Sequence, residues 1–199
     1  MYLSRLELNT RVKEVKRDIA NLYEMHSTLK RAFPDESATT FLWRIENRRE
    51  GYPSILVQSV TKPSWSNILV QNYFIFCELK KYDVNNFLEN RMVLRFRLMA
   101  NPIVKKNGKR LPLLLPEEQD KWLKKKASIN GFSINTVTIG NPMPVNMVKR
   151  KTGDIIQLNS VPFEGILQII DKAKFLKVLE NGIGPAKAFG FGLLSIARY

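Results

Sequence analysis

The apolar residues of this chain change their spacing several times, and the order of these changes restricts the fold more than any other feature. In residues 1–9, Tyr2, Leu3, Leu6 and Leu8 alternate with polar side chains in a strand-like way, which is typical of a half-buried strand. Residues 12–33 then place apolar side chains three and four apart, which predicts one amphipathic helix that Pro34 ends. The elements predicted next are strands in 39–47 and 53–60, a short helix in 62–73 and a strand in 73–80.

This order, βαββαβ, is that of the ferredoxin-like arrangement, in which two helices cover one face of a four-stranded antiparallel sheet. Residues 82–90 are polar and rich in Asn, so we place a domain joint there. The same order then returns. Its predicted elements are strands in 91–104, 132–140, 161–170 and 191–199, a helix in 115–130, and a helix in 171–182 with Asp171 as N-cap and Gly182 as its stop. We therefore predict an α+β chain of two tandem ferredoxin-like (RRM-like) domains, 1–84 and 91–199.

The charge of the chain is concentrated in its second half. Of the formal net charge of +14, residues 91–199 carry 19 basic against 7 acidic side chains, whereas residues 1–90 carry 13 against 11. Solubility alone explains part of such an excess. An excess this local favours a polyanionic partner, with nucleic acid ahead of a membrane surface, because no long basic helix with a wide apolar face is found.

Several classes of site are disfavoured by what the sequence lacks. One His and one Cys make a zinc site of the usual kind untenable, and the scattered carboxylates do not suggest a two-metal nuclease. Neither a P-loop nor a G-x-S-x-G motif is present. We expect no metal and no cofactor. The lone Cys77, the lack of an apolar run of membrane-spanning length and a start without an apolar leader indicate a cytoplasmic protein.

His26 is the only side chain whose ordinary pKa lies near neutrality. Tyr23 comes three residues before it and Lys30 four after, so a helix stacks the three on one face, with Arg31 close by. Such a set could move the protons of RNA cleavage, in which the 2′-hydroxyl attacks the adjacent phosphorus and a cation stabilises the phosphorane. The alternative is ordinary: a hydrogen-bonded rim histidine, a tyrosine at the core edge and cations at a helix end.

Basic residues also gather in three clusters of the second half, and each could be merely a solvated face. Together they favour a track for the phosphates of double-stranded or hairpin RNA. The clusters are Lys105, Lys106, Lys109 and Arg110 in a predicted loop, Lys121, Lys124, Lys125 and Lys126 on a predicted helix, and Lys149, Arg150 and Lys151 in a predicted hairpin turn. The aromatic signature of RNA-binding sheets is not found, so we do not expect bases to stack on an open sheet.

The stretch "NGIGPAKAFGFGLLS" near the C-terminus contains four of the chain's 10 glycines, Gly182, Gly184, Gly190 and Gly192. Its exposed N–H groups and Lys187 could bind phosphate oxygens. A helix cap followed by a bulge into the last strand would explain the same glycines.

The residues that carry these features resemble the CasE family, the CRISPR precursor-RNA endoribonucleases of type I-E systems. The resemblance runs through "MYLSRLEL", "DIANLYEMHSTLKRAFP", "RLMANPIVKKNGKR" and "GIGPAKAFGFGLLSIA", and it is weakest in 60–90 and 127–160. It implies two ferredoxin-like domains and metal-independent cleavage beside the stem of each CRISPR repeat, leaving a 2′,3′-cyclic phosphate and a 5′-hydroxyl.

The resemblance also assigns roles and partners. It gives His26 the catalytic role and Tyr23 a place beside it, and it puts the loop from Gly182 to Gly192 near the RNA. The partners that it implies are the crRNA hairpin, which the enzyme keeps after cutting, and the other subunits of the Cascade complex. We expect no membrane partner and a monomer outside that complex. The alternatives are a non-catalytic RNA-hairpin scaffold of the same fold and a basic DNA-binding protein.

Overall fold

The computed structural model describes residues 1–33, 40–46, 52–148 and 152–199, and its contacts group into two compact units. Both units combine helices with antiparallel sheets, which confirms the predicted α+β class. The first unit contains Met1–Asp83, Asn146–Ile156 and Ala188–Gly190, and the second contains Val84–Val145, Gln157–Lys187 and Phe191–Tyr199. The first unit therefore includes two segments that a single boundary between 84 and 91 assigns to the second.

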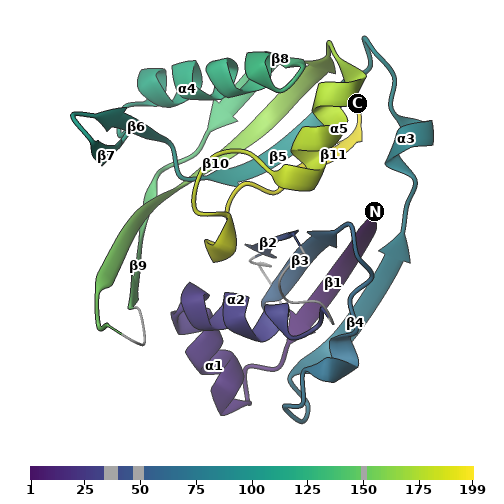
Figure 1. The fold of residues 1–199 in the computed structure, drawn as a ribbon, viewed down its shortest axis with the longest axis vertical. Helices are drawn as coiled ribbons and strands as arrows, with labels where there is room; N and C mark the ends of the chain where they lie inside the picture. The colour runs from purple at the N-terminus through teal and green to yellow at the C-terminus, as the bar shows by residue number, and fades with distance from the viewer. Residues whose placement is uncertain (34–39, 47–51, 149–151) are drawn as a thin grey trace. The chain divides into compact units, whose positions relative to one another are not determined.

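The first unit is built on a four-stranded antiparallel sheet. Its strands are β1 (Tyr2–Leu8), β2 (Phe41–Glu46), β3 (Ser54–Ser59) and β4 (Phe74–Lys81), in the order β2-β3-β1-β4. This is the ferredoxin-like order that the sequence predicts. The helices α1 (Lys13–Ala20) and α2 (Leu22–Lys30) lie together beside it (Figure 1). Val15 of α1 and Met25 of α2 share one buried cluster with Leu6, Trp43 and Ile55 of the sheet.

Two predictions about the helices of this unit are wrong. The predicted helix over 12–33 is interrupted at Asn21, whose backbone is extended, with φ −136° and ψ 100°. The Asn21 side chain accepts a hydrogen bond from the N–H of Tyr23 and so caps a second helix. The predicted helix in 62–73 is only a single 3-10 turn, η1 (Trp65–Asn67).

The second unit repeats the arrangement. Its main strands are β5 (Val93–Ala100), β8 (Phe132–Ile139), β10 (Ile155–Ile169) and β11 (Leu194–Arg198), in the order β11-β5-β10-β8, with β9 (Met143–Val148) paired to β10. Its helices are α3 (Val84–Phe87), α4 (Pro116–Ile129) and α5 (Lys172–Asn181). Trp122 of α4 stacks on Phe163 of β10, and Phe175 of α5 packs edge-on against Phe132 of β8.

The ends of α5 are those that the sequence predicts. The carboxylate of Asp171 accepts a hydrogen bond from the N–H of Lys174 at 3.1 Å, and Gly182 ends the helix with φ 72°. The predicted strand over 91–104 is divided, because Asn101 and Pro102 separate β5 from β6 (Ile103–Lys106). Neither the pairing of β6 with β7 (Lys109–Pro112) nor strand β9 was predicted. None of the helices in the described part of the chain has the length and apolar character needed to cross a membrane.

Candidate functional site

The helix α2 carries the predicted catalytic residues. Tyr23, His26 and Lys30 all lie on it, and Arg31 is its C-cap. The Tyr23 side chain is 37% exposed, whereas His26 is half-buried. The imidazole of His26 stacks on the ring of Phe41 in β2, with centroids 5.0 Å apart and planes 16° apart. Phe41 of the sheet thus fixes the plane of the imidazole, and α2 fixes the backbone position of His26.

The environment of His26 keeps its imidazole neutral. Burial away from water, and secondarily the ammonium group of Lys30, lower the pKa of His26 below its ordinary value of 6.5. The Nδ1 atom is buried and has no hydrogen-bond partner among the residues that the structure describes. A neutral imidazole has a lone pair to accept a proton, which suits a general base at neutral pH.

A buried carboxylate fixes the position of α2. Asp18 of α1 is 0% exposed and accepts hydrogen bonds of 2.7 Å from the hydroxyls of Thr28 on α2 and Tyr73. Arg17 donates to the same carboxylate at 2.8 Å, and its guanidinium lies 3.9 Å from Glu24 of α2. Burial first, and then the bond to Asp18, raise the pKa of Tyr73 far above its usual value, so the phenol stays protonated. The turns on both sides of His26 are therefore anchored.

We expect Tyr73→Phe to lower the free energy of unfolding by about 1.5–3 kcal/mol, since it deletes a buried hydrogen bond to a charged group. Urea unfolding followed by circular dichroism measures this change. Tyr82→Phe is the control, because the Tyr82 hydroxyl donates to the neutral amide oxygen of Gln58 at 2.9 Å. That substitution should cost about 1 kcal/mol. Equal losses for the two variants would show that the charge of Asp18 does not strengthen the hydrogen bond from Tyr73.

The glycine-rich segment has a packing role of its own. The four glycines have positive φ, namely Gly182 (72°), Gly184 (80°), Gly190 (82°) and Gly192 (85°). A Cβ on Gly192 would lie 2.7 Å from the carbonyl oxygen of Ile183, and one on Gly190 would lie 3.2 Å from the ring of Trp43. Backbone conformation and close packing therefore account for these two glycines, and phosphate binding by the segment stays a prediction.

Phe189 is a neighbour of the site that the sequence interpretation missed. It lies in the 3-10 turn η2 (Lys187–Phe189), and its ring centroid is 6.4 Å from that of Tyr23 with a tilt of 33°. The segment that holds it belongs to the first unit by its contacts. Its only sequence signal is an aromatic side chain directly before a glycine of this segment.

In the second unit, the structure brings together two cations that the sequence placed in different clusters. Burial first, and then the ammonium group of Lys126, lower the pKa of Lys187. Lys126 lies over the ring of Trp122, 6.0 Å from its centroid, and a Cβ on Gly184 would lie 3.0 Å from the same ring. The glycine-rich segment and α4 thus place two positive charges close together, which favours an anion such as a phosphate there.

The first predicted basic cluster lies on a β-hairpin rather than in a loop, and we call β6 and β7 the basic hairpin. Asn107 and Gly108 have φ of 50° and 75°, which suits a two-residue type I′ turn. The turn sets the four exposed cations in cross-strand pairs, Lys105 opposite Arg110 and Lys106 opposite Lys109. The basic hairpin therefore carries four positive charges close together.

Of the other two basic clusters, the structure describes only the one on α4. On α4, Lys121, Lys124 and Lys125 are exposed, Lys126 is half-buried, and the ammonium group of Lys124 is 2.7 Å from the carboxylate of Asp120. The predicted residues Lys149, Arg150 and Lys151 lie outside the described residues. The RNA-contacting roles of all three clusters stay predictions.

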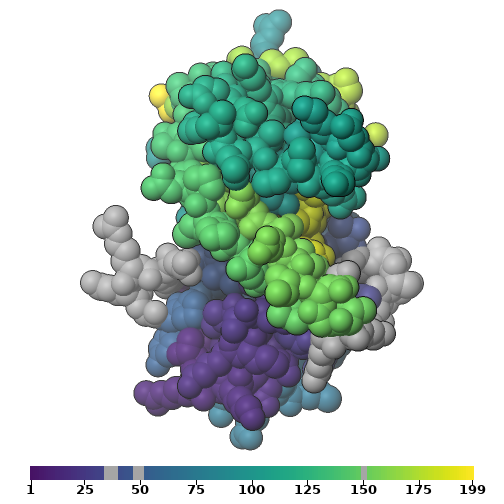
Figure 2. All heavy atoms as spheres, turned by 90° about the vertical axis from the view of Figure 1, so that its left-hand side faces the viewer, coloured from purple at the N-terminus to yellow at the C-terminus, as the bar shows by residue number. Residues whose placement is uncertain are grey.

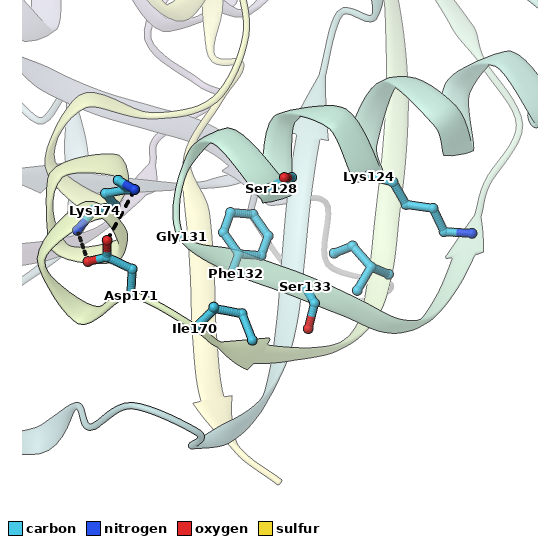
Figure 3. Close-up of a pocket in the computed structure, with 9 residues that line it drawn as sticks. Lys124, Ser128, Gly131, Phe132, Ser133, Ile170, Asp171 and Lys174 are labelled. Carbon is cyan, nitrogen blue, oxygen red and sulfur yellow. Dashed lines mark hydrogen bonds and ion pairs between the residues drawn. The ribbon is translucent and has the colours of Figure 1, made fainter.

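The second unit also contains a cavity of about 350 Å³ beside α4. Lys124, Ser128 and Lys174 are among its lining residues (Figure 3). The ammonium group of Lys174 is 3.2 Å from the carboxylate of Asp171, so this cation already has a partner. The cavity contains none of the α2 residues. Within the described ranges, no three His, Cys, Asp or Glu side chains are grouped as metal ligands would be.

Comparisons with known proteins agree over nearly the full length of the chain. A family model described as CRISPR associated protein matches residues 1–198. The CRISPR-associated endoribonuclease Cse3 of Thermus thermophilus is 36% identical over 99% of this chain and 100% of its own. The CRISPR system Cascade subunit CasE of Escherichia coli K12 is 31% identical over 99% of each. The structure of Thermus thermophilus Cse3 bound to an RNA representing a pre-cleavage complex superposes with a TM-score of 0.89, at 34% identity and 98% coverage of both chains.

Proposed function

Because the chain belongs to the CasE family of CRISPR-associated proteins, we propose that it is the endoribonuclease that cuts CRISPR precursor RNA at the repeat hairpin. The cut RNA stays bound, and the protein with its crRNA is a subunit of Cascade. The relatives named as an endoribonuclease and as a Cascade subunit each match 99% of this chain, which supports both parts of the proposal. The substrate is a transcript, so we place the protein in the cytoplasm, as a monomer when outside Cascade.

One observation carries the assignment of the catalytic group. The imidazole of His26 has a lowered pKa and lies on the same helix as Tyr23 and Lys30. Neutral His26 takes the proton of the ribose 2′-hydroxyl, and the oxygen attacks the adjacent phosphorus. The bond from phosphorus to the 5′-oxygen breaks, and that oxygen receives a proton. The products are a 2′,3′-cyclic phosphate and a 5′-hydroxyl.

A single imidazole leaves the second proton transfer to another group. Tyr23, Lys30 or water supplies it. The phenol of Tyr23 is exposed and can donate, and the ammonium group of Lys30 can also stabilise the charge on the phosphorane. The RNA phosphates are bound by the cations of the second half of the chain. These include the pair Lys126 and Lys187 and the basic hairpin.

The reaction is tested by incubating the pure protein with a repeat hairpin in excess EDTA. We expect one cut beside the stem and a 2′,3′-cyclic phosphate on the upstream fragment, seen by mass spectrometry, because no step in the proposed mechanism uses a metal. A hairpin with a 2′-deoxyribose at the cut position should bind and stay intact. Tight binding with no product from the ribose hairpin would favour the scaffold function instead, and displacement of RNA by duplex DNA would favour a DNA-binding protein.

A further inference from the structure

The side chain of Asn21, between α1 and α2, makes two hydrogen bonds at once. Its Oδ1 accepts from the N–H of Tyr23 at 3.2 Å, which caps the helix that carries His26. Its Nδ2 donates to the carbonyl oxygen of Val148 in β9 at 3.0 Å, across 127 residues of sequence. One amide group therefore connects the start of α2 to a strand from the second half of the chain.

The end of β9 that Asn21 contacts belongs to the first unit, although the strand begins in the second. The described residues of this part of the chain, 146–148 and 152–156, belong to this unit by their contacts, and we call them the arm. Met147, directly before Val148, is 1% exposed. Figure 2 shows the green atoms of this part of the chain beside the purple atoms of the N-terminal residues. In the sequence, Val148 is followed by three consecutive cations. The hydrogen bond therefore reaches the strand that leads directly into a basic cluster.

Capping alone does not explain why this position is an asparagine. Asp, Ser and Asn cap helices about equally well, because each offers a side-chain oxygen to the free N–H groups. Only Asn combines that acceptor with an N–H donor on a second atom. The acceptor in β9 is a main-chain carbonyl, so the contact depends on the position of the strand and on no particular side chain at 148.

We propose that Asn21 is a positioning residue for the cleavage, which holds the arm at a fixed place relative to His26. This inference rests on the function proposed above. Contacts to phosphates carry no sequence information and set only where the RNA backbone lies. Attack by the 2′-hydroxyl requires its partners to be about 3–3.5 Å apart and aligned. An arm fixed to the N-cap of α2 presents one phosphodiester of the bound stem to the imidazole, whereas an untethered arm presents several.

The test uses three substitutions that separate the two hydrogen bonds. Asn21→Ser and Asn21→Asp keep an oxygen for the N–H of Tyr23 and lose the Nδ2 donor, whereas Asn21→Ala loses both. The serine variant is neutral, so it also removes the charge repulsion that aspartate would add near RNA. We expect the serine variant, which keeps the cap, to unfold at a higher urea midpoint than Asn21→Ala and to bind the uncleavable 2′-deoxy hairpin with native affinity.

The cleavage reaction itself should change. In single-turnover experiments we expect Asn21→Ser and Asn21→Asp to cut about tenfold more slowly, the upper range for losing one hydrogen bond. Sequencing of the product ends should show additional cuts at neighbouring linkages, which a purely stabilising residue would not produce.

Two results would overturn the inference. One is an Asn21→Ser protein that cuts at the native rate and at a single linkage. The other is an Asn21→Ser protein that is slow only because its urea midpoint has fallen to that of Asn21→Ala. The His26→Ala protein separates this failure from failure of the proposed function. If His26→Ala is inactive while Asn21→Ser is normal, only the role of Asn21 is wrong.

Discussion

Replacement of His26 by alanine is expected to slow single-turnover cleavage of the repeat hairpin by about 100-fold or more, the usual contribution of a general acid or base. The affinity for the 2′-deoxy hairpin should stay native, because the imidazole is half-buried against Phe41 and lies away from the cationic clusters in sequence. Ser27→Ala is a matched control, since Ser27 is the exposed neighbour on the same helix. A His26→Ala protein that cuts like the control would remove His26 from the mechanism.

The pH profile of the native enzyme shows which proton His26 moves. The pKa of His26 is lowered from its ordinary value of 6.5. The imidazole is neutral at a pH above this lowered pKa and protonated at a pH below it. If His26 is the base, the rate rises with pH up to this pKa and then stays level through neutral pH. If His26 is the acid, the rate falls as the pH rises through the same pKa. The inflection should be absent from the residual activity of His26→Ala.

Removal of the four cations of the basic hairpin is expected to weaken RNA binding on the order of 100-fold, if each exposed phosphate contact contributes about 0.7 kcal/mol. The plot of log affinity against log salt should become less steep by roughly 3 to 4, because each lost phosphate contact releases about one counterion fewer. The variant replaces Lys105, Lys106, Lys109 and Arg110 with alanine and keeps the turn of Asn107 and Gly108.

The control for this variant removes the same charge from the first unit. Arg11, Lys13, Lys16 and Lys62 are exposed there, and no RNA contact is proposed for them. Filter binding of both proteins across a salt series measures the two slopes. Equal losses of affinity and slope would mean that net charge alone attracts the RNA and that the basic hairpin has no special part.

The features that the sequence predicted well depend on local signals. The strand predicted in residues 1–9 appears as β1, and the caps at Asp171 and Gly182 bound α5 as predicted. The interruption at Asn21 was missed because the apolar spacing continues through Ile19 and Leu22 without a break. What makes Asn21 distinctive is an acceptor that lies 127 residues away, which no local pattern records.

The candidate site was predicted in the same uneven way. Helical spacing was enough to group Tyr23, His26 and Lys30, because all three lie on one continuous segment. The burial that lowers the pKa of His26 comes in part from Phe41 on β2, and the ring beside Tyr23 comes from Phe189. Both neighbours reach α2 only through the tertiary fold. The basic clusters could be recognised in the sequence. The pairing of four cations across a tight turn could be recognised only from the register of β6 and β7.

The first unit is assembled from three separate stretches of chain, the last of which ends at Gly190. During translation, the ribosome completes the β2-β3-β1-β4 sheet and α2 more than a hundred residues before it adds Phe189. A nascent chain therefore carries α2 long before all the neighbours of that helix have been added. Dividing the gene at the predicted joint between 84 and 91 would leave Val148 and Phe189 on the other polypeptide. The two halves would then have to associate before the N-terminal half had all of its neighbours.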